Sequence, residues 1–348
     1  MDHPVFSSPQ RLSRRLAMSI AAGFLLLLCS FPGIAASPSR TQADALQQEL
    51  ERLVSGLDGS AGIYVLDLRS GRAATVNPQV GFPMASTIKV PVAVHILALV
   101  DEGKLDLQQQ VQLQEGDIYT AMGGPMALHL TPGSAITVRD LLHMMITVSD
   151  NNATDIMIRL GGGAAAVDAR MRALGIQGIR VDRYIWEMLA HYMGRQEASP
   201  DRPFTQADYT RMWDAARSAE ERARHTGMYN DDPRDTSTPA GMASLLKLVW
   251  DGKALEPATT GVLKSIMLET STGQGRLRGM LPDATPVAHK TGTVGEVIND
   301  VGVVALPDGR GEVIVAVFVK AKGGEARDRA IAQVARAAHD YFLFVPRR

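Results

Sequence analysis

The chain has 348 residues, of which 45% are hydrophobic, and its 36 lysines and arginines nearly balance its 37 aspartates and glutamates. This neutrality argues against a nucleic-acid-binding protein, which usually carries a basic excess, and the apolar content excludes a disordered chain. The single cysteine, Cys29, excludes an internal disulfide framework and any cysteine-rich zinc module.

Residues 1–36 are predicted to be a secretory signal peptide. Three arginines between positions 11 and 15 precede Leu16–Cys29, an uncharged and mostly apolar run of 14 residues, and small residues end at Ala36. The run is short for a membrane span, which disfavours the alternative of an uncleaved anchor. Cleavage would leave residues 37–348 as one domain without a thiol, which suits the periplasm or the exterior of the cell.

Helices are predicted mainly in the middle of the mature chain. Leu46, Leu50, Leu53 and Leu57 recur at helical spacing and predict a helix over residues 44–57. The same reasoning predicts further helices over residues 86–102, 138–147, 152–160, 239–250, 259–269 and 325–342.

Strands are predicted near both ends, over residues 61–68, 73–76, 287–292, 300–306 and 313–320. This order predicts an α/β fold of the α+β sandwich type. An antiparallel sheet built from both chain ends would be flanked by helices and would carry an inserted all-α lobe. We expect the α/β lobe at about 40–82 and 250–348, and the all-α lobe at about 83–249.

The first motif is Ser86-Thr87-Ile88-Lys89, at the start of a predicted helix. A spacing of three places the serine and the lysine on one helical face. A partly desolvated lysine has a lowered pKa and can take the proton of a neighbouring serine, which then becomes a nucleophile. The pattern alone is common by chance, so the alternative is an ordinary helix start.

The second motif is Ser149-Asp150-Asn151, between two predicted helices. A hydroxyl beside an amide can relay a proton and hydrogen-bond a substrate. All three residue types are also good N-caps, so taken alone the motif favours a helix cap.

The third motif is Lys290-Thr291-Gly292, in a predicted strand. A cation and a hydroxyl followed by a residue without a side chain would let a substrate carboxylate lie along the strand edge. The alternative is an ordinary exposed strand.

In this order the three motifs resemble the signature shared by class A β-lactamases and penicillin-binding proteins. The similarity to the class A serine β-lactamases extends well beyond them, from about Leu46 to Phe342. The matching segments are residues 82–92, 129–133, 136–141, 146–153, 235–243 and 287–293. The chain is identified as a member of that family.

The resemblance implies roles for matching residues. Ser86 would be the acylated nucleophile, and Lys89 would be the base that activates it. Ser149 would pass a proton to the leaving nitrogen, and Asn151 would contact the substrate amide. The implied ligand is a β-lactam or another peptidoglycan-related small molecule, with no cofactor, metal or nucleic acid, and the protein would be a monomer.

The third motif would bind the substrate carboxylate through Lys290 and Thr291, with Gly292 between them and Thr293. Backbone N–H groups of Ser86 and Thr293 would form the oxyanion hole. Arg276, 14 residues before Lys290, matches an auxiliary arginine of some family members; the alternative is a solvated surface arginine.

The chain departs from the family at the Ω-loop, which spans residues 181–236 and is enlarged. Arg183 and Asp235 match the ion pair that closes the loop's neck. The family's deacylating glutamate follows that arginine by two residues, where this chain has Ile185. Glu187 would replace it if the loop follows a longer path, with His191 at the place of a family asparagine; alternatively, Glu187 is only a charged residue on a lid.

Three functions remain open from the sequence. A periplasmic or secreted β-lactamase would acylate Ser86 and deacylate with Glu187 or another acid. A penicillin-binding protein or peptidoglycan-peptide hydrolase of the same fold would deacylate slowly. A non-catalytic protein would use the enlarged loop to bind a cell-wall fragment or a partner. The intact motifs argue against the third function, and Ile185 argues against the first. The overall fold and the details of the motifs favour the first over the second.

Overall fold

The structure is a computed structural model that describes residues 38–119, 122–194, 207 and 218–344, with only the backbone of residues 38–44. Contacts divide the chain into Met1–Pro38 and Ser39–Arg348, and the fold below is that of the second unit. The predicted signal peptide, Cys29 included, lies outside the described residues. In the part that is described, no helix is long and apolar enough to cross a membrane.

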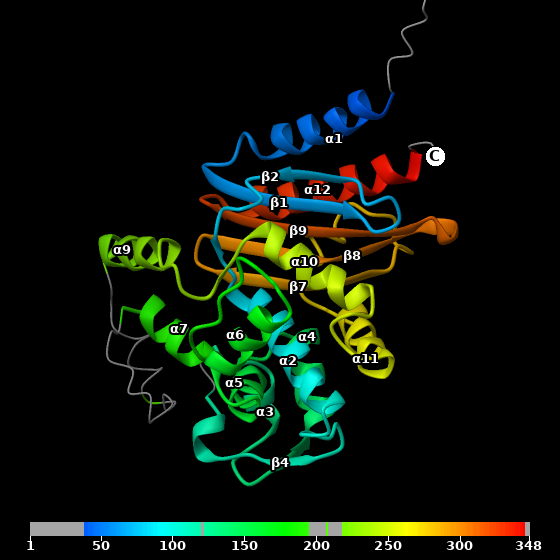
Figure 1. The fold of residues 1–348 in the computed structure, drawn as a ribbon. Coiled ribbons are helices and arrows are strands. Elements are labelled where there is room, and N and C mark those ends of the chain that lie inside the picture. Colours follow the sequence, from blue (N-terminus) through cyan, green and yellow to red (C-terminus); the bar gives the residue numbers. More distant parts are fainter. Residues whose placement is uncertain (1–37, 120–121, 195–206, 208–217, 345–348) are drawn as a thin grey trace, which may run out of the picture. The chain divides into compact units, whose positions relative to one another are not determined.

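Five antiparallel strands form the main sheet, in the order β2-β1-β9-β8-β7. Their bounds are Gly59–Asp67 for β1, Ala73–Val76 for β2, Val287–Val294 for β7, Val297–Leu306 for β8 and Gly311–Ala321 for β9. Strand β1 pairs with β9, so the two ends of the chain meet in the middle of the sheet (Figure 1). The predicted antiparallel sheet from both chain ends is therefore confirmed.

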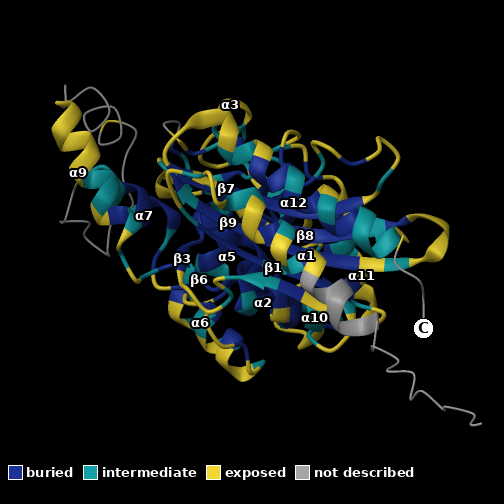
Figure 2. Ribbon diagram, turned by 90° about the horizontal axis from the view of Figure 1, so that it is seen from above, coloured by how far each residue is buried: buried dark blue, intermediate teal, exposed yellow. Residues whose placement is uncertain are grey.

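Helices cover both faces of this sheet, which explains why its central strands are apolar on both sides. Along β9, Val315 and Val317 pack in one core cluster with residues of α1 (Pro38–Val54) and α12 (Gly324–Phe344). The intervening Ala316 and Phe318 belong to the other cluster, with α10 (Pro239–Trp250). Figure 2 shows the sheet buried between these helices.

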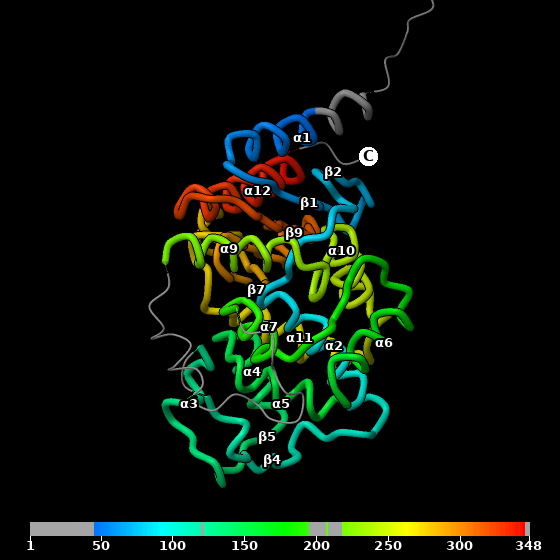
Figure 3. Tube along the Cα trace, turned by 90° about the vertical axis from the view of Figure 1, so that its left-hand side faces the viewer, coloured from blue at the N-terminus to red at the C-terminus, as the bar shows by residue number. Residues whose placement is uncertain are grey.

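The helical part contains α2 (Lys89–Asp101), α4 (Val138–Thr147) and α5 (Asn151–Leu160), which contact one another (Figure 3). Almost all of α2 is buried, because neighbours surround it. The other elements are β3 (Phe82–Pro83), η1 (Ala85–Ile88), β4 (Gln110–Gln112), η2 (Glu115–Asp117), α3 (Met126–His129), β5 (Ala135–Thr137), α6 (Ala164–Ala173), α7 (Ile185–Tyr192), α9 (Ala219–Asn230), β6 (Thr236–Ser237), α11 (Pro257–Leu268) and η3 (Pro307–Gly309).

The predicted lobe boundary differs from the structure in two ways. Helix α10, predicted to belong to the all-α lobe, packs on β1 and β9 of the sheet. The lobe predicted as all-α also contains two small sheets, β3-β6 and β4-β5. These strands have two or three residues each, too few for a period-two pattern to be recognised in the sequence.

Candidate active site

Ser86 lies in η1, a short 3-10 turn that follows β3 and runs directly into α2. The residue before it, Ala85, has a φ of 46°, a left-handed conformation that is uncommon for a residue with a side chain. Ser86 is half-buried, whereas Lys89 at the start of α2 is fully buried. The turn therefore presents the serine hydroxyl above a lysine that has no access to solvent.

The Lys89 amine is surrounded by oxygen atoms of the first two motifs. Its Nζ lies 3.2 Å from Ser86 Oγ, 3.1 Å from Ser149 Oγ and 2.6 Å from Asn151 Oδ1. Burial lowers the pKa of Lys89 to about 7, although the carboxylates of Asp150 and Asp155 act in the opposite direction. Near neutral pH a large fraction of this amine is unprotonated and able to accept the serine proton.

The second motif is both a helix cap and part of the site. Asp150 caps α5, because its Oδ1 accepts a hydrogen bond from Ala153 N–H at 2.8 Å. Ser149 precedes it with a φ of 59°, which turns the chain sharply between α4 and α5. The cap fixes the turn that carries Ser149 and Asn151, so neither of the two interpretations of this motif excludes the other.

Lys290, on β7, also contacts the Ser149 hydroxyl. Its Nζ donates to Ser149 Oγ at 2.9 Å and to the carbonyl of Thr291 at 2.9 Å. Burial, followed by the nearby positive charge of Lys89, lowers the pKa of Lys290 well below its usual value. A substrate carboxylate would supply the negative charge that favours the protonated amine.

The edge of β7 packs against the nucleophile turn at Gly292. A Cβ atom at this position would lie 2.6 Å from the Met84 carbonyl oxygen and 3.1 Å from Ser86 N, so only glycine permits this approach. Thr293 follows and is exposed. The backbones of Ser86 and Thr293 are thereby brought to the same end of the site.

Arg276 is buried beside β7 and is not a solvated surface residue. Its guanidinium donates to Thr293 Oγ1 at 2.6 Å, to the carbonyl of Gly292 at 3.0 Å and to Asp328 at 2.6 Å. Thr291 donates to or accepts from Thr272 through their hydroxyls, 2.6 Å apart. Arg276 thus reaches the predicted carboxylate site through Thr293.

Known proteins match this chain over most of its length. A model of the β-lactamase enzyme family matches residues 45–342. The extended-spectrum β-lactamase PER-1 of Pseudomonas aeruginosa is 30% identical, over 93% of this chain and 95% of its own. The chain belongs to the class A serine β-lactamase family.

Solved structures agree with this assignment. A β-lactamase from Chitinophaga pinensis is 29% identical, with a TM-score of 0.71 over 85% of this chain and 98% of its own. The ancestral class A β-lactamase of Gram-negative bacteria is 32% identical, with a TM-score of 0.69 over 85% and 99%. The predicted fold class is confirmed by these neighbours and by the sheet described above.

The neck of this class A Ω-loop is closed by a buried ion pair. Arg183 Nε donates to Asp235 Oδ2 at 2.5 Å, and both side chains are about 95% buried or more. Asp235 Oδ1 also accepts the backbone N–H groups of Asp182 and Arg183, at 2.7 and 3.1 Å. The same carboxylate therefore joins the entry and the exit of the loop.

Glu187 lies in the first turn of α7, inside the Ω-loop. Its Oε2 accepts a hydrogen bond from the Tyr184 N–H at 2.8 Å, so the carboxylate caps its own helix. Burial raises the pKa of Glu187. In the described part of the chain, no hydrogen bond or ion pair joins Glu187 to Ser86 or Lys89, and the structure leaves Glu187 outside that network.

His191, on the next turn of α7, contacts the neck. Its Nδ1 lies 2.8 Å from Arg183 Nη1. Since the guanidinium can only donate, this nitrogen of His191 accepts and carries no proton. The imidazole therefore supports Arg183 in the structure.

Asp155 is a site residue that the motifs do not contain. It lies on α5 one turn after Asn151 and is buried. Its carboxylate accepts the N–H groups of Ile185 and Trp186, at 2.6 and 3.1 Å, and the Tyr119 hydroxyl at 2.8 Å. Burial raises the pKa of Asp155 to about 7, against the effect of these donors. An acidic residue four positions after Asn151, on the same face of the helix, is the only sequence signal for it.

We expect Asp155→Ala to destabilise the protein by about 3 kcal/mol or more, because three buried donors would lose their acceptor at about 1–3 kcal/mol each. Urea unfolding followed by circular dichroism measures this loss. Asp251→Ala is the matched control, since Asp251 pairs with two exposed lysines, Lys247 and Lys253, and there we expect a loss within about 1 kcal/mol. Equal losses in the two variants would contradict the anchoring role of Asp155.

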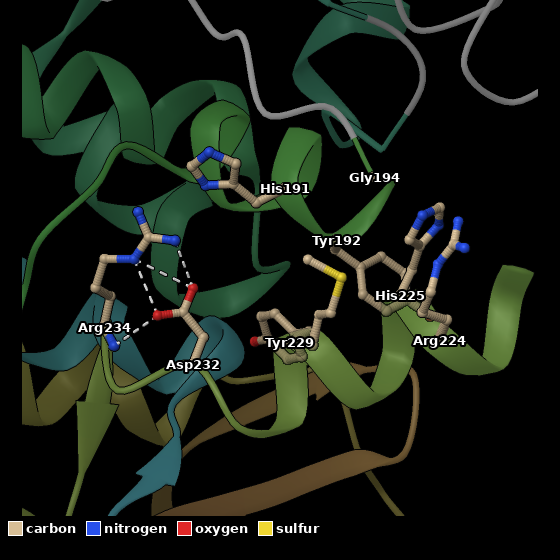
Figure 4. Close-up of a pocket in the computed structure, with 9 residues that line it drawn as sticks. His191, Tyr192, Gly194, Arg224, His225, Tyr229, Asp232 and Arg234 are labelled. Atoms are coloured by element: carbon tan, nitrogen blue, oxygen red, sulfur yellow. Dashed lines mark hydrogen bonds and ion pairs between the residues drawn. The ribbon is translucent and has the colours of Figure 1, made fainter.

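A cavity of about 490 Å³ lies between α7 and α9 of the Ω-loop (Figure 4). Arg234 and Asp232 pair at one end, and Tyr192 and Tyr229 meet edge to face, with ring centroids 5.5 Å apart. The lining residues are His191, Tyr192, Gly194, Arg224, His225, Met228, Tyr229, Asp232 and Arg234. None of the residues of the three motifs lines this cavity, so it is separate from the nucleophile.

Three or more histidine, cysteine or acidic side chains do not gather anywhere in the described ranges in a way that could hold a metal ion. The contacts of the site are instead made between lysine, serine and asparagine side chains.

Proposed function

We propose that the protein is a β-lactamase that opens the β-lactam amide through an acyl-enzyme on Ser86. The observation that carries this proposal is the position of one buried amine, Lys89 Nζ, within 3.2 Å of the hydroxyls of both Ser86 and Ser149. That geometry connects the attacking oxygen to a proton donor for the leaving nitrogen.

In the first half-reaction Ser86 Oγ attacks the carbonyl carbon of the lactam. Its proton passes to the unprotonated Lys89 amine, and the backbone N–H groups of Ser86 and Thr293 stabilise the developing oxyanion. The carbon–nitrogen bond then breaks as the Ser149 hydroxyl gives its proton to the ring nitrogen. Ser149 regains a proton from Lys89, 3.1 Å away, which has just accepted the proton of Ser86, while Lys290 donates a hydrogen bond to Ser149 Oγ from 2.9 Å.

The substrate carboxylate would bind beside Lys290 and Thr291. Both are buried, and Arg276 orients the neighbouring Thr293 hydroxyl. A carboxylate near Lys290 would favour the protonated, positively charged form of its amine, which burial alone disfavours. The ligand class is accordingly a β-lactam with an acid group on the carbon next to the ring nitrogen.

In the second half-reaction water hydrolyses the ester, and we propose Glu187 as the base that takes the proton of that water. Its raised pKa brings this carboxylate closer to the value that suits a general base at neutral pH. Glu187 must first release the Tyr184 N–H, and losing such a cap costs about 1 kcal/mol. That cost is small beside a catalytic barrier.

Glu187→Gln tests this step. We expect acylation to continue and deacylation to fall by roughly 10²–10⁴-fold, so that the acyl-enzyme accumulates. A time course with a chromogenic cephalosporin, together with intact-protein mass, measures both. Glu220→Gln is the matched control, because Glu220 is exposed in the first turn of α9 and should change neither rate.

The same experiment separates the other candidate function. The capped carboxylate of Glu187 favours a slowly deacylating penicillin-binding protein if the cap never opens. A stoichiometric burst with a persistent adduct in the unmodified protein would support that function. Steady turnover that Ser86→Ala abolishes supports the β-lactamase. Unchanged turnover in Glu187→Gln would assign the second base to another group.

We also propose that residues 1–36 direct the protein to the periplasm or the exterior. The basic region, the apolar run and the small residues before position 37 support this proposal. N-terminal sequencing of the protein from a periplasmic extract tests it, with a start near Ser37 as the expected result.

A further inference from the structure

The peptide unit between Met84 and Ala85 lies directly before Ser86, and the Ala85 backbone at its end has an unusual, left-handed conformation. Ala85 has a φ of 46° and is buried. A left-handed residue with a side chain persists only where its surroundings hold it. The next backbone N–H is that of Ser86, one of the two proposed oxyanion donors.

Asn299, on β8, holds the carbonyl end of this peptide unit. Its Nδ2 donates to the Met84 carbonyl at 2.9 Å and to the Pro83 carbonyl at 2.9 Å. Asn299 is fully buried, and its Oδ1 accepts the Val319 N–H at 3.3 Å, which fixes the orientation of the amide. The Met84 carbonyl also accepts the N–H and the hydroxyl of Thr87, at 3.1 and 2.8 Å. If Asn299 turned away, its own buried Nδ2 and the Val319 N–H would be left unpaired.

Tyr229, on α9, holds the N–H end of the same peptide unit. Its hydroxyl oxygen faces the Ala85 backbone N–H, and this donor acts against the burial that raises the pKa of the hydroxyl. The hydroxyl lies 3.7 Å from Met188 Sδ, to which it can donate, and the side chain is buried. Tyr229 comes from the enlarged part of the Ω-loop, so this segment lies against the turn that carries Ser86.

We propose that Tyr229 and Asn299 are positioning residues that hold the Met84–Ala85 peptide from both ends and thereby aim the Ser86 N–H and hydroxyl. The inference rests on the proposed function, and it assigns a task to the enlarged Ω-loop. The loop's helix α9 supplies one half of the support for the nucleophile, and the sheet supplies the other. Neither residue touches the substrate.

The chemical consequence follows from the position of the Ser86 N–H. Gly292 packs directly over this turn, so a shift of the Met84–Ala85 peptide also moves the Ser86 N–H relative to Thr293. An oxyanion forms in both half-reactions, and the donors must match its position. Loss of either support should lower kcat in acylation and deacylation while substrate binding at Lys290 is retained.

Tyr229→Phe is the sharpest first test, because it removes one oxygen atom and keeps the ring. We expect kcat with a chromogenic cephalosporin to fall roughly 10- to 100-fold, the range that misplacement of a reacting group produces, with little change in KM. Tyr192→Phe is the matched control. Tyr192 packs against the ring of Tyr229 but comes from α7, and its variant should keep the kcat of the unmodified protein.

Asn299→Asp adds a readout that a packing role would not produce. An ionised carboxylate facing two carbonyls cannot donate, whereas a protonated one can donate to the Met84 carbonyl. We expect a loss of roughly 100-fold at pH 8 and a partial recovery of kcat as the pH falls to 5, relative to the unmodified protein at each pH. Thr259→Val, which removes a buried hydroxyl contact on α11, controls for lost stability and should show no recovery.

The affinity for phenylboronic acid, which forms a tetrahedral serine adduct, separates this inference from the proposed function. Weaker binding of the boronic acid by Tyr229→Phe and Asn299→Asp than by the control variants supports the positioning role, whether or not the protein turns over β-lactams. Absence of β-lactam turnover in the unmodified protein would overturn only the proposed function. Unchanged kcat and boronic-acid affinity in both variants would overturn the inference. A loss in Asn299→Asp that does not recover at pH 5 would remove Asn299 from it.

Discussion

Replacing Lys89 by methionine is expected to slow acylation of Ser86 by about 10²–10⁴-fold, the contribution typical of a positioned general base. Methionine keeps the buried volume and removes only the amine, whereas Lys89→Ala would also open a cavity. Stopped-flow acylation with a chromogenic cephalosporin measures the rate. Lys104→Ala is the matched control, because Lys104 is exposed and pairs only with Glu102 at the surface.

The same residue predicts the pH dependence of the unmodified protein. Burial lowers the pKa of Lys89 to about 7, and only the unprotonated amine accepts the serine proton. Acylation should therefore rise with pH through a midpoint near 7 and fall as the pH drops below it. A pH-independent acylation rate between 6 and 8, or normal acylation of Lys89→Met, would remove Lys89 from the mechanism.

Asp235→Ala is expected to destabilise the protein by about 3–5 kcal/mol, the usual cost of removing one partner from a buried ion pair. Arg183 has only 5% of its side chain exposed and would keep a single carboxylate partner, Asp232 at 3.1 Å, beside the neutral His191 Nδ1 at 2.8 Å. Two backbone N–H groups at the loop entry would also lose their acceptor. Chemical denaturation followed by tryptophan fluorescence gives the free energy of unfolding.

Asp251→Ala provides the comparison for that measurement. Asp251 pairs with Lys247 on an exposed helix end, and exposed pairs contribute about 0–1 kcal/mol. The Asp235 variant should also lose β-lactam turnover. Without its carboxylate, residue 235 is no longer fixed to the loop entry, and its backbone carbonyl, which accepts the Met84 N–H at 2.9 Å, would shift together with the turn that carries Ser86. A loss of stability no greater than in Asp251→Ala would show that the neck does not depend on this pair.

Prediction from the sequence succeeded best where one local pattern determines the structure. Helices α4 and α10 have the predicted bounds, because Thr137 and Thr238 cap them and an apolar face follows. It failed in the Ω-loop, where α7 and α9 were not predicted. The polar surface of α9 gives almost no periodic signal, and Tyr229 is its only buried residue.

The sequence by itself determined the family of the chain and the residue that we propose as its nucleophile. Ser86 and Lys89 are three residues apart on one turn, so their encounter depends only on local geometry. The motifs around Ser149 and Lys290 were recognised from their residues in the same way, and the chain belongs to the class A β-lactamase family.

Only the tertiary structure decided the electrostatics of these residues and the groups that support them. Tertiary packing buries Lys89 and so lowers its pKa, brings the Arg276 guanidinium to Thr293, and makes the Asp155 carboxylate the acceptor of an N–H group of α7. The supports of the Met84–Ala85 peptide come from β8 and α9, distant in sequence from Ser86. Local patterns do not encode such contacts, because they form only after long segments of chain have closed.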